Sequence, residues 1–436
     1  MKMKDSGVEW IGEIPEGWEL RKIKYILNER KEKNDPIETN FILSLSMERG
    51  VFPYSEKVGG GNKAKEDLTA YKIARPNDIV INSMNILAGS VGISKWVGAV
   101  SPVYYTYFSK DENIDIYYYH YLFQCSEFQK SLLGLGNGIM MKETESGKLN
   151  TIRMRIPSDK LGNLLFPIPT KLEQQKIADF LDSKIALIDQ IIADTKRSIE
   201  ELKAYKQSLI TETVTKGLDP NVPMKDSGVE WIGEIPEGWK TAPLKFVFNE
   251  IGSGTTPSTA HEEFYEGKNF WIQSGDLYQK RFVSDTRKKL TDEGLKSSSA
   301  LTVYSAPFIA LAMYGASIGN VSISLVNASV NQAVAALSDT RIAEIGYIYY
   351  ALTISKDFLV LEAKGGTQPN ISQEILKKWH VPIPDILEQK KIIDYLNVKI
   401  KNIEDLISYK QKIINDYETY KKSLIYEYVT GKKQVN

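Results

Sequence analysis

The fifteen residues KDSGVEWIGEIPEGW, from Lys4 to Trp18, recur letter for letter from Lys225 to Trp239. A second shared feature, a PIP motif followed by LEQ, occupies 167–174 and returns 215 positions later at 382–389. Between these shared blocks the two halves of the chain differ almost completely. Self-similarity at a fixed spacing indicates a duplicated structural unit. The sequence therefore predicts a pseudo-two-fold internal repeat, in which a common frame carries two domains that differ from each other.

The composition is that of an average globular protein. The chain has 436 residues, 42% of them hydrophobic and 25% charged, which leaves room for two to four domains. Its net charge of zero provides no bulk attraction to polyanions or anionic membranes, so any nucleic-acid binding must come from local patches. One cysteine, Cys125, and three scattered histidines do not suit a disulfide or a zinc site. Without a signal-like N-terminus or a membrane-length apolar run, the protein is expected to be soluble and cytoplasmic.

A heptad pattern follows each PIP motif. Mostly apolar side chains recur alternately four and three residues apart from Leu181 to Leu209, and again from Leu396 to Leu424, with matching polar interruptions at Lys206 and Lys421. Each predicted helix covers about 40 residues, or roughly 60 Å. One such seam also fits an ordinary core helix, but two matching seams favour pairing as an antiparallel coiled coil. The predicted helix-pair and partner contacts are Leu181, Ile185, Ile188, Ile192 and Leu202 in the first helix, and Leu396, Ile400, Ile403, Ile407 and Tyr417 in the second.

The ends of the two helices predict a circular arrangement. Thr170-x-x-Glu173 and Asp385-x-x-Glu388 are capping boxes that begin the helices. The first helix ends at Gly217 and leads into the second repeated block, whereas the second helix ends near Gly431. The block at Lys4–Trp18 supplies the missing continuation of the second helix. We therefore expect the termini to lie close together, and a circular permutant opened near Asp219 to fold and function.

The two divergent regions mix short β-rich runs with helical stretches such as Tyr117–Leu132 and Ile345–Leu361. The predicted fold class is therefore α/β, with two globular α/β domains separated by the long helices. The predicted segments are a repeated block at 1–18, a variable domain at 19–166, a long helix at 167–217, a linker and repeated block at 218–239, a variable domain at 240–381 and a long helix at 382–436.

The chain lacks the motifs that catalysis would need. It has no P-loop, and the glycine-rich loop at 134–138 lacks the spacing of a dinucleotide fingerprint. The DPN sequence at 219–221 resembles only the first half of an adenine methyltransferase motif. Asp385, Glu388 and Lys390 imitate a metal-dependent nuclease signature, but they lie within one helical turn and double as the capping box. We expect a non-catalytic chain.

Further motifs in the second divergent region complete a family resemblance. They are GTTPS at 254–258, WIQSGDL at 271–277, YGASIG at 314–319, NQA at 331–333 and GTQPNIS at 366–372. Together with the repeated blocks and the helix starts, these motifs strongly resemble the specificity subunit of type I restriction-modification systems, over essentially the whole chain. The first region departs from the pattern, because Gly59–Asn62 and Val100–Pro102 are only loose counterparts.

The resemblance implies a function in DNA recognition. Each variable domain would be a target-recognition domain for one half of a bipartite, asymmetric sequence in double-stranded DNA, and the paired helices would set the spacer and dock two modification subunits. Those methyltransferase subunits would bind S-adenosylmethionine and methylate adenine, while restriction subunits would hydrolyse ATP with Mg²⁺, translocate and cut. This chain itself would bind no cofactor or metal and would contact no membrane.

Base recognition requires forked or amide side chains, arginine for guanine and asparagine or glutamine for adenine. The candidates for bases are Gln273, Tyr314, Gln368 and Asn370 in the second domain, and Arg49, Lys57, Asn62, Lys63 and Lys65 in the first. Better suited to phosphates are Lys280, Arg281, Arg287, Lys288 and Lys289. The alternative for each basic cluster is a solvated loop, and for Asn331 and Gln332 it is the support of buried backbone. The tryptophans of the repeated blocks are expected to pack against the helix ends.

Two other functions remain open. The first is a non-catalytic coiled-coil adaptor that displays two protein-binding domains, which the neutral overall charge favours. The second is a self-contained enzyme acting on DNA. Salt dependence separates the adaptor from a DNA-binding protein, because phosphate contacts release counterions and make binding fall steeply with salt.

Overall fold

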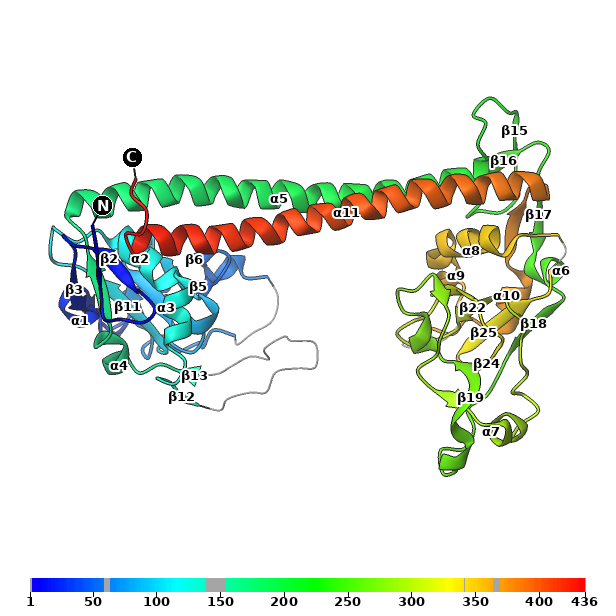
Figure 1. Ribbon diagram of the computed structural model, residues 1–436, viewed down its shortest axis with the longest axis horizontal. Helices are drawn as coiled ribbons and strands as arrows, with labels where there is room; N and C mark the ends of the chain where they lie inside the picture. Colours follow the sequence, from blue (N-terminus) through cyan, green and yellow to red (C-terminus); the bar gives the residue numbers. More distant parts are fainter. Residues whose placement is uncertain (1, 59–62, 139–153, 341, 364–368, 436) are drawn as a thin grey trace. The chain divides into compact units, whose positions relative to one another are not determined.

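The computed structural model describes residues 2–58, 63–138, 154–340, 342–363 and 369–435. The chain forms two compact units (Figure 1). Unit 1 consists of Met1–Lys196 with Lys412–Asn436, and unit 2 consists of Arg197–Gln411. Each unit therefore contains one divergent region and part of both long helices. No helix in the described ranges has the length and apolar character needed to cross a membrane.

The two long helices are α5 (Lys171–Lys216) and α11 (Ile386–Val429). The predicted capping box of α5 is complete: Thr170 N donates to Glu173 Oε2 at 2.8 Å, and Glu173 N donates to Thr170 Oγ1 at 3.4 Å. At α11, Glu388 N donates to Asp385 Oδ1 at 2.9 Å, while the Glu388 carboxylate accepts from Trp239. These caps satisfy backbone donors that a helix start leaves unpaired.

The helices pair antiparallel within each unit. In unit 1 the rings of Phe180 and Tyr428 are 4.4 Å apart, and Lys421 Nζ lies 2.6 Å from Asp189 Oδ1. Along α5 the residue number rises from the first contact to the second, while along α11 it falls. In unit 2, Lys206 Nζ lies 2.9 Å from Glu404 Oε1. The two ion pairs join the same positions of the two copies, so Lys421 and Lys206 are each paired with a carboxylate of the opposite helix.

The predicted seam positions face inward to different degrees. Those that are buried are Leu181, Ile188, Ile192, Leu396, Ile400 and Ile403. Those that are partly buried are Ile185, Leu202, Ile407 and Tyr417. The seam thus supplies apolar area on one side of each helix, which is what an amphipathic helix needs in order to pack.

Both divergent regions are built on a sheet with the same strand order. In unit 1 the order is β4 (Asn28–Glu29), β11 (Tyr104–Phe108), β8 (Ile79–Asn82) and β9 (Val91–Ile93). In unit 2 it is β18 (Glu250–Ser253), β25 (Val334–Ser338), β22 (Phe308–Ala312) and β23 (Val321–Ser324), all antiparallel. The short strand β20 (Phe282–Val283) adds in parallel to β23. Strands β22 and β25 are buried along their whole length, which explains their continuous apolar sequences.

A helix covers one face of each sheet, α2 (Ile116–Gln124) beside β9 and α8 (Ile345–Ile354) beside β23. Each is followed by a separate short helix, α3 (Ser126–Ser131) or α9 (Lys356–Leu361). The predicted helical stretches Tyr117–Leu132 and Ile345–Leu361 are therefore helical, but each is divided into two helices by one break. The breaks fall at Cys125 and Ser355, two buried residues that leave the helical backbone conformation.

Paired glutamines connect each α/β region to its long helix. Gln174 Oε1 accepts from Asp115 N at 2.8 Å, and its Nε2 donates to Asn113 O and Pro169 O. In unit 2 the matching Gln389 makes the same three bonds, to Glu344 N, Ile342 O and Pro384 O. Tyr118 and Tyr347 likewise donate to the carbonyls of Val429 and Val214, near the ends of α11 and α5. The internal repeat therefore extends to individual hydrogen bonds.

Two of the four block tryptophans, Trp18 and Trp239, pack on the helix ends as predicted, whereas Trp10 packs on Phe128 and Phe166 and Trp231 stacks on Trp379. Trp18 Nε1 donates to Glu173 at 3.3 Å, and Trp239 Nε1 donates to Glu388 at 2.9 Å. After α11, Lys432 Nζ donates to Ile11 O at 2.8 Å. The N-terminal block and the C-terminal residues thus lie together in unit 1, which confirms the predicted circular closure.

The remaining elements are short. Strand pairs are β1 (Met3–Asp5) with β2 (Glu13–Pro15), β3 (Glu19–Lys22) with β14 (Leu165–Ile168), β5 (Leu43–Ser46) with β6 (Gly50–Pro53), β7 (Lys72–Ala74) with β10 (Gly98–Val100), β12 (Asn137–Gly138) with β13 (Met154–Arg155), β15 (Met224–Asp226) with β16 (Glu234–Pro236), and β17 (Lys240–Pro243) with β26 (His380–Ile383). Strand β19 (Tyr265–Ile272) lies between β21 (Lys289–Leu290) and β24 (Ala328–Val330). The short helices are α1 (Ile23–Ile26), α4 (Ser158–Gly162), α6 (Leu244–Val247), α7 (Asp292–Lys296) and α10 (Gln373–Lys378).

Candidate nucleic-acid interface

Four loops of unit 2 that are far apart in the sequence meet at one place. We call them the loop cluster: residues 253–257, 312–319, 331–333 and 369–373. Gly254 N donates to Asn331 O at 3.4 Å, and Thr256 Oγ1 donates to Gln332 Oε1 at 2.7 Å. These bonds join the first loop to the third.

The other two loops are joined in the same way. Ile371 N donates to Met313 O at 2.8 Å, and Tyr314 and Asn370 form a β-bridge. Gln373 Nε2 donates to Ser253 Oγ at 2.7 Å, which joins the fourth loop to the first. Two predicted base-contacting residues, Tyr314 and Asn370, are therefore adjacent.

The loop cluster places amide side chains at the surface. Asn370 and Gln332 are exposed, and Tyr314 is partly exposed. Asn331 is buried, and its Oδ1 accepts from Ala333 N at 3.1 Å, so the structural alternative holds for this residue. Gln332 is an exposed amide that the sequence did not distinguish from its buried neighbour. Exposed amides on rigid loops are the groups that recognise adenine.

The side chain of Gln273, a predicted base contact, also caps a short helix. Its side chain accepts from Asp276 N and so caps the short 3-10 helix η4 (Ser274–Leu277). The buried Asp276 carboxylate accepts from Gln273 N at 2.9 Å and from Arg287 N at 3.2 Å. The side-chain oxygen of Gln273 therefore already accepts a hydrogen bond within the protein. Its side-chain nitrogen is the group that could donate to a base.

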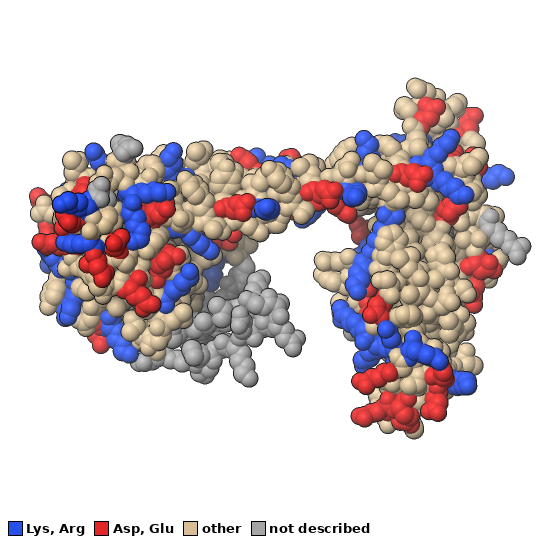
Figure 2. All heavy atoms as spheres, in the orientation of Figure 1, with Lys and Arg blue, Asp and Glu red and all other residues tan. Residues whose placement is uncertain are grey.

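The predicted phosphate contacts of unit 2 divide into two kinds. Lys280, Arg287 and Lys288 are exposed, as a phosphate contact requires, and Arg287 Nε also lies 3.8 Å from Asp276 Oδ1. Lys289 Nζ pairs with Asp285 Oδ1 at 2.9 Å. The Arg281 guanidinium carbon lies 4.9 Å from the Tyr350 ring centre, and Arg281 Nε is buried. Arg281 thus packs on α8. In Figure 2, Lys and Arg side chains gather along one edge of unit 2.

The predicted contacts of unit 1 are less favourably placed. Arg49, in the turn between β5 and β6, forms an ion pair with Glu56 and lies 4.1 Å above the Phe52 ring. Lys57 Nζ lies 5.3 Å from the Tyr54 ring centre. Lys63 and Lys65 are exposed. Asn62 and Gln368 lie outside the described residues.

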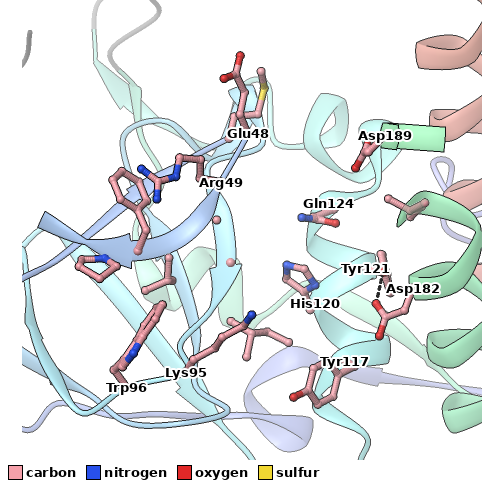
Figure 3. A pocket seen from close by; sticks show the side chains of 18 of the residues that line it. Glu48, Arg49, Lys95, Trp96, Tyr117, His120, Tyr121, Gln124, Asp182 and Asp189 are labelled. Atoms are coloured by element: carbon pink, nitrogen blue, oxygen red, sulfur yellow. Dashed lines mark hydrogen bonds between the residues drawn. The ribbon is translucent and has the colours of Figure 1, made fainter. Parts of the chain in front are cut away.

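A cleft of about 490 Å³ opens beside Arg49, between the β5–β6 hairpin and helices α2 and α5 (Figure 3). It is lined by four carboxylates (Glu48, Glu56, Asp182, Asp189) and three cationic side chains (Arg49, Lys95, Lys421). Asp182 accepts from the Tyr121 hydroxyl, and Asp189 pairs with Lys421. Burial lowers the pKa of His120, on the wall of the cleft, to about 4, so its ring is neutral near pH 7. A cleft with this charge does not suit a phosphate.

Arg155 is not among the contacts predicted from the sequence, although its place in the repeat matches that of a predicted contact. It is exposed, and it stands 215 positions before Asn370, with an isoleucine following each. Extending the repeat spacing upstream from the PIP motifs would have found it.

Comparison with known proteins identifies the family. Residues 15–201 and 236–421 each match the family model described as the type I restriction modification DNA specificity domain. The two matches cover most of the chain. The chain belongs to this family. One specificity-domain match falls on each copy of the internal repeat, which explains why the two copies share their frame.

Specificity subunits from other organisms are similar to this chain over half or more of their length. A putative type I restriction enzyme MjaX specificity subunit from Methanocaldococcus jannaschii is 24% identical over 417 residues, covering 88% of this chain and 86% of the relative. The EcoR124I/EcoR124II specificity subunit from Escherichia coli is 24% identical over 232 residues, about half of each chain.

Solved structures share the fold. A chain from a structural study of complex assembly and conformational transition in the type I R-M system superimposes with a TM-score of 0.72 at 13% identity, covering 95% of this chain and 98% of the other. The HsdS subunit from Thermoanaerobacter tengcongensis gives a TM-score of 0.57 at 13% identity, covering 96% and 98%.

Proposed function

We propose that this specificity-family chain recognises a two-part, asymmetric DNA sequence, with one divergent region contacting each half-site. The proposal rests on one observation: the two units share their internal structure but differ in their exposed loops. The two units share their strand order and their glutamine and tyrosine hydrogen bonds, yet their exposed loops carry different side chains. A repeated frame with different loops suits recognition of two different base sequences.

The paired helices suit the role of spacer and docking site. Large apolar side chains are exposed at equivalent positions of the two copies: Leu172 is 63% and Leu387 72% exposed, and Tyr205 is 55% and Tyr420 50% exposed. Exposed apolar groups on a helix favour a protein partner. Because the positions repeat, we infer two copies of one partner, the modification subunits. S-adenosylmethionine, ATP and Mg²⁺ belong to partner subunits in this proposal, and this chain contributes no catalytic group.

The test is selection from a random pool of DNA duplexes by this chain assembled with its modification subunits. The expected result is a two-part motif with a fixed spacer, and binding that falls steeply as salt rises because phosphate contacts release counterions. No duplex binding at any salt concentration would instead support the protein-binding adaptor.

Two variants of unit 2 distinguish base contacts from phosphate contacts. Asn370→Ala should relax specificity in one half-site only, whereas Arg287→Ala should weaken all sequences alike and reduce the salt slope by about 1. Lys225→Ala, an exposed lysine in the repeated block, is the matched control and should change neither. Uniform weakening by Asn370→Ala would place that residue at a phosphate.

A further inference from the structure

Arg155 occupies in unit 1 the place that Asn370 occupies in unit 2. Residues 155–169 and 370–384 align without a gap and end in the same PIP motif. The next residue, Ile156, donates its backbone N–H to Ser83 O at 3.1 Å. In unit 2, Ile371 makes the same bond to Met313 O at 2.8 Å. Both isoleucines are fully buried, which fixes the backbone on either side.

The loops that receive these bonds also match. After β8, Asn82 N donates to Ser90 O at 3.0 Å. After β22, Ala312 N donates to Asn320 O at 2.9 Å. Each loop therefore closes on itself in the same way before the next strand begins. The loop that contains Tyr314 in unit 2 is thus represented in unit 1 by residues 83–89.

The surface chemistry at this position of unit 1 suits a nucleobase. Arg155 is exposed, and none of the described acidic side chains forms an ion pair with it. Burial lowers the pKa of the nearby Lys72 ammonium, and the positive charge of Arg155 adds to that effect. Asn85, in the adjoining loop, is also exposed, and its side chain does not cap the 3-10 helix η2 (Ile86–Ala88) that follows.

We propose that Arg155, supported by Asn85, is the base-recognition site of unit 1, and that its guanidinium donates two N–H groups to O6 and N7 of a guanine in the major groove. This assignment rests on the proposed function of the chain. A guanidinium that is not held in an ion pair can donate two parallel N–H groups to one guanine. Arg49, the arginine that the sequence suggested for unit 1, is paired with Glu56 and stacked on Phe52 instead.

The test uses the full chain assembled with its modification subunits and duplex selection from a random pool. Arg155→Lys keeps the positive charge but removes the two parallel N–H donors of the guanidinium. Discrimination at one G·C pair should therefore fall about 10-fold to 100-fold. Arg155→Asn should shift preference at that same position towards A·T. Arg21→Ala is the matched control: Arg21 is an exposed arginine on β3 of the same unit, beside Glu19, and its loss should alter neither half-site.

The outcomes separate this assignment from the proposed function. The assignment requires that the half-site altered by Arg155 variants differ from the one altered by Asn370→Ala. An unchanged motif, or equal weakening of all sequences, would overturn the assignment of Arg155 while the two-part motif of the unaltered protein stood. The absence of any two-part motif in the unaltered protein would overturn the proposed function together with it.

Discussion

Gly254 determines how closely two loops of unit 2 approach, because a Cβ at this residue would lie 1.8 Å from Val330 O. We expect Gly254→Ala to force the loop cluster apart and to lower the free energy of unfolding of unit 2 by about 1–3 kcal/mol. Urea unfolding of the full chain measures this loss. Gly238→Ala is the control, because a Cβ there meets no atom within 4 Å. Equal stability of the two variants would show that the close approach is unimportant.

His120 should make the stability of unit 1 depend on pH. Its pKa is lowered by burial to about 4 from the ordinary value of 6.5. Between these pH values His120 is protonated in the unfolded chain but not in the folded chain. The free energy of unfolding therefore decreases as pH falls from 6.5 to 4. The loss is at most about 3 kcal/mol.

Denaturant unfolding at pH 7.5 and pH 4.5 tests the role of His120. The comparison variant is His120→Tyr, since Tyr349 stands at the matching position of α8. This variant should lose less stability than the unaltered protein over the same interval. The same loss in both proteins would contradict the assignment of the proton to His120.

The sequence predicted some individual contacts and not others. Tyr314 and Asn370 lie in separate motifs that both predict base contacts, and the structure brings them together. Arg281 was chosen for its charge, but its guanidinium packs on Tyr350. A run of basic residues shows where charge is available, whereas the partner of each side chain depends on tertiary packing that a local pattern does not contain.

At the scale of elements, Gln174 and Gln389 should be essential to the joint between each sheet region and its long helix. Replacing either with leucine leaves one backbone N–H and two carbonyls without their amide partner, and the buried carbonyl among them, Pro169 O or Pro384 O, costs about 1–3 kcal/mol when unpaired. We expect Gln174→Leu to destabilise unit 1 and Gln389→Leu to destabilise unit 2. Hydrogen exchange measures the two separately.

Gln190→Leu is the control for this loss, because Gln190 is an exposed residue of α5 whose amide donates to Asp194 of the same helix at 2.9 Å and makes no hydrogen bond with the sheet region among the described residues. It should leave exchange in both units unchanged. If all three variants behaved alike, the glutamine bridges would not stabilise the joint.

The long helices could be predicted because their signals are local. A heptad seam, a capping box and a terminal glycine all lie within the helix or next to it. The breaks at Cys125 and Ser355 could not, because a buried residue takes its backbone conformation from packing between elements. For the same reason the sequence predicts short β-rich runs in both regions but not the order of the sheet strands.

At the scale of the whole molecule, the internal repeat predicts tolerance of circular permutation. The N-terminal block and the end of α11 meet where Lys432 Nζ donates to Ile11 O and Glu13 O, at 2.8 and 3.0 Å. A permutant with joined termini, opened near Asp219, should keep both units folded and should select the same two-part motif. Circular dichroism and duplex selection check the two parts of this expectation. A permutant that folded but selected no sequence would count against the circular frame.

The most direct measurement of the central claim is sequence-resolved adenine methylation of a random-site DNA library by the modification subunits, with and without this chain. We expect a two-part motif with a fixed spacer that appears only when the chain is present, with one half altered by Asn370→Ala and the other by Arg155→Lys. Methylation without any motif, or the same motif in the absence of the chain, would contradict it.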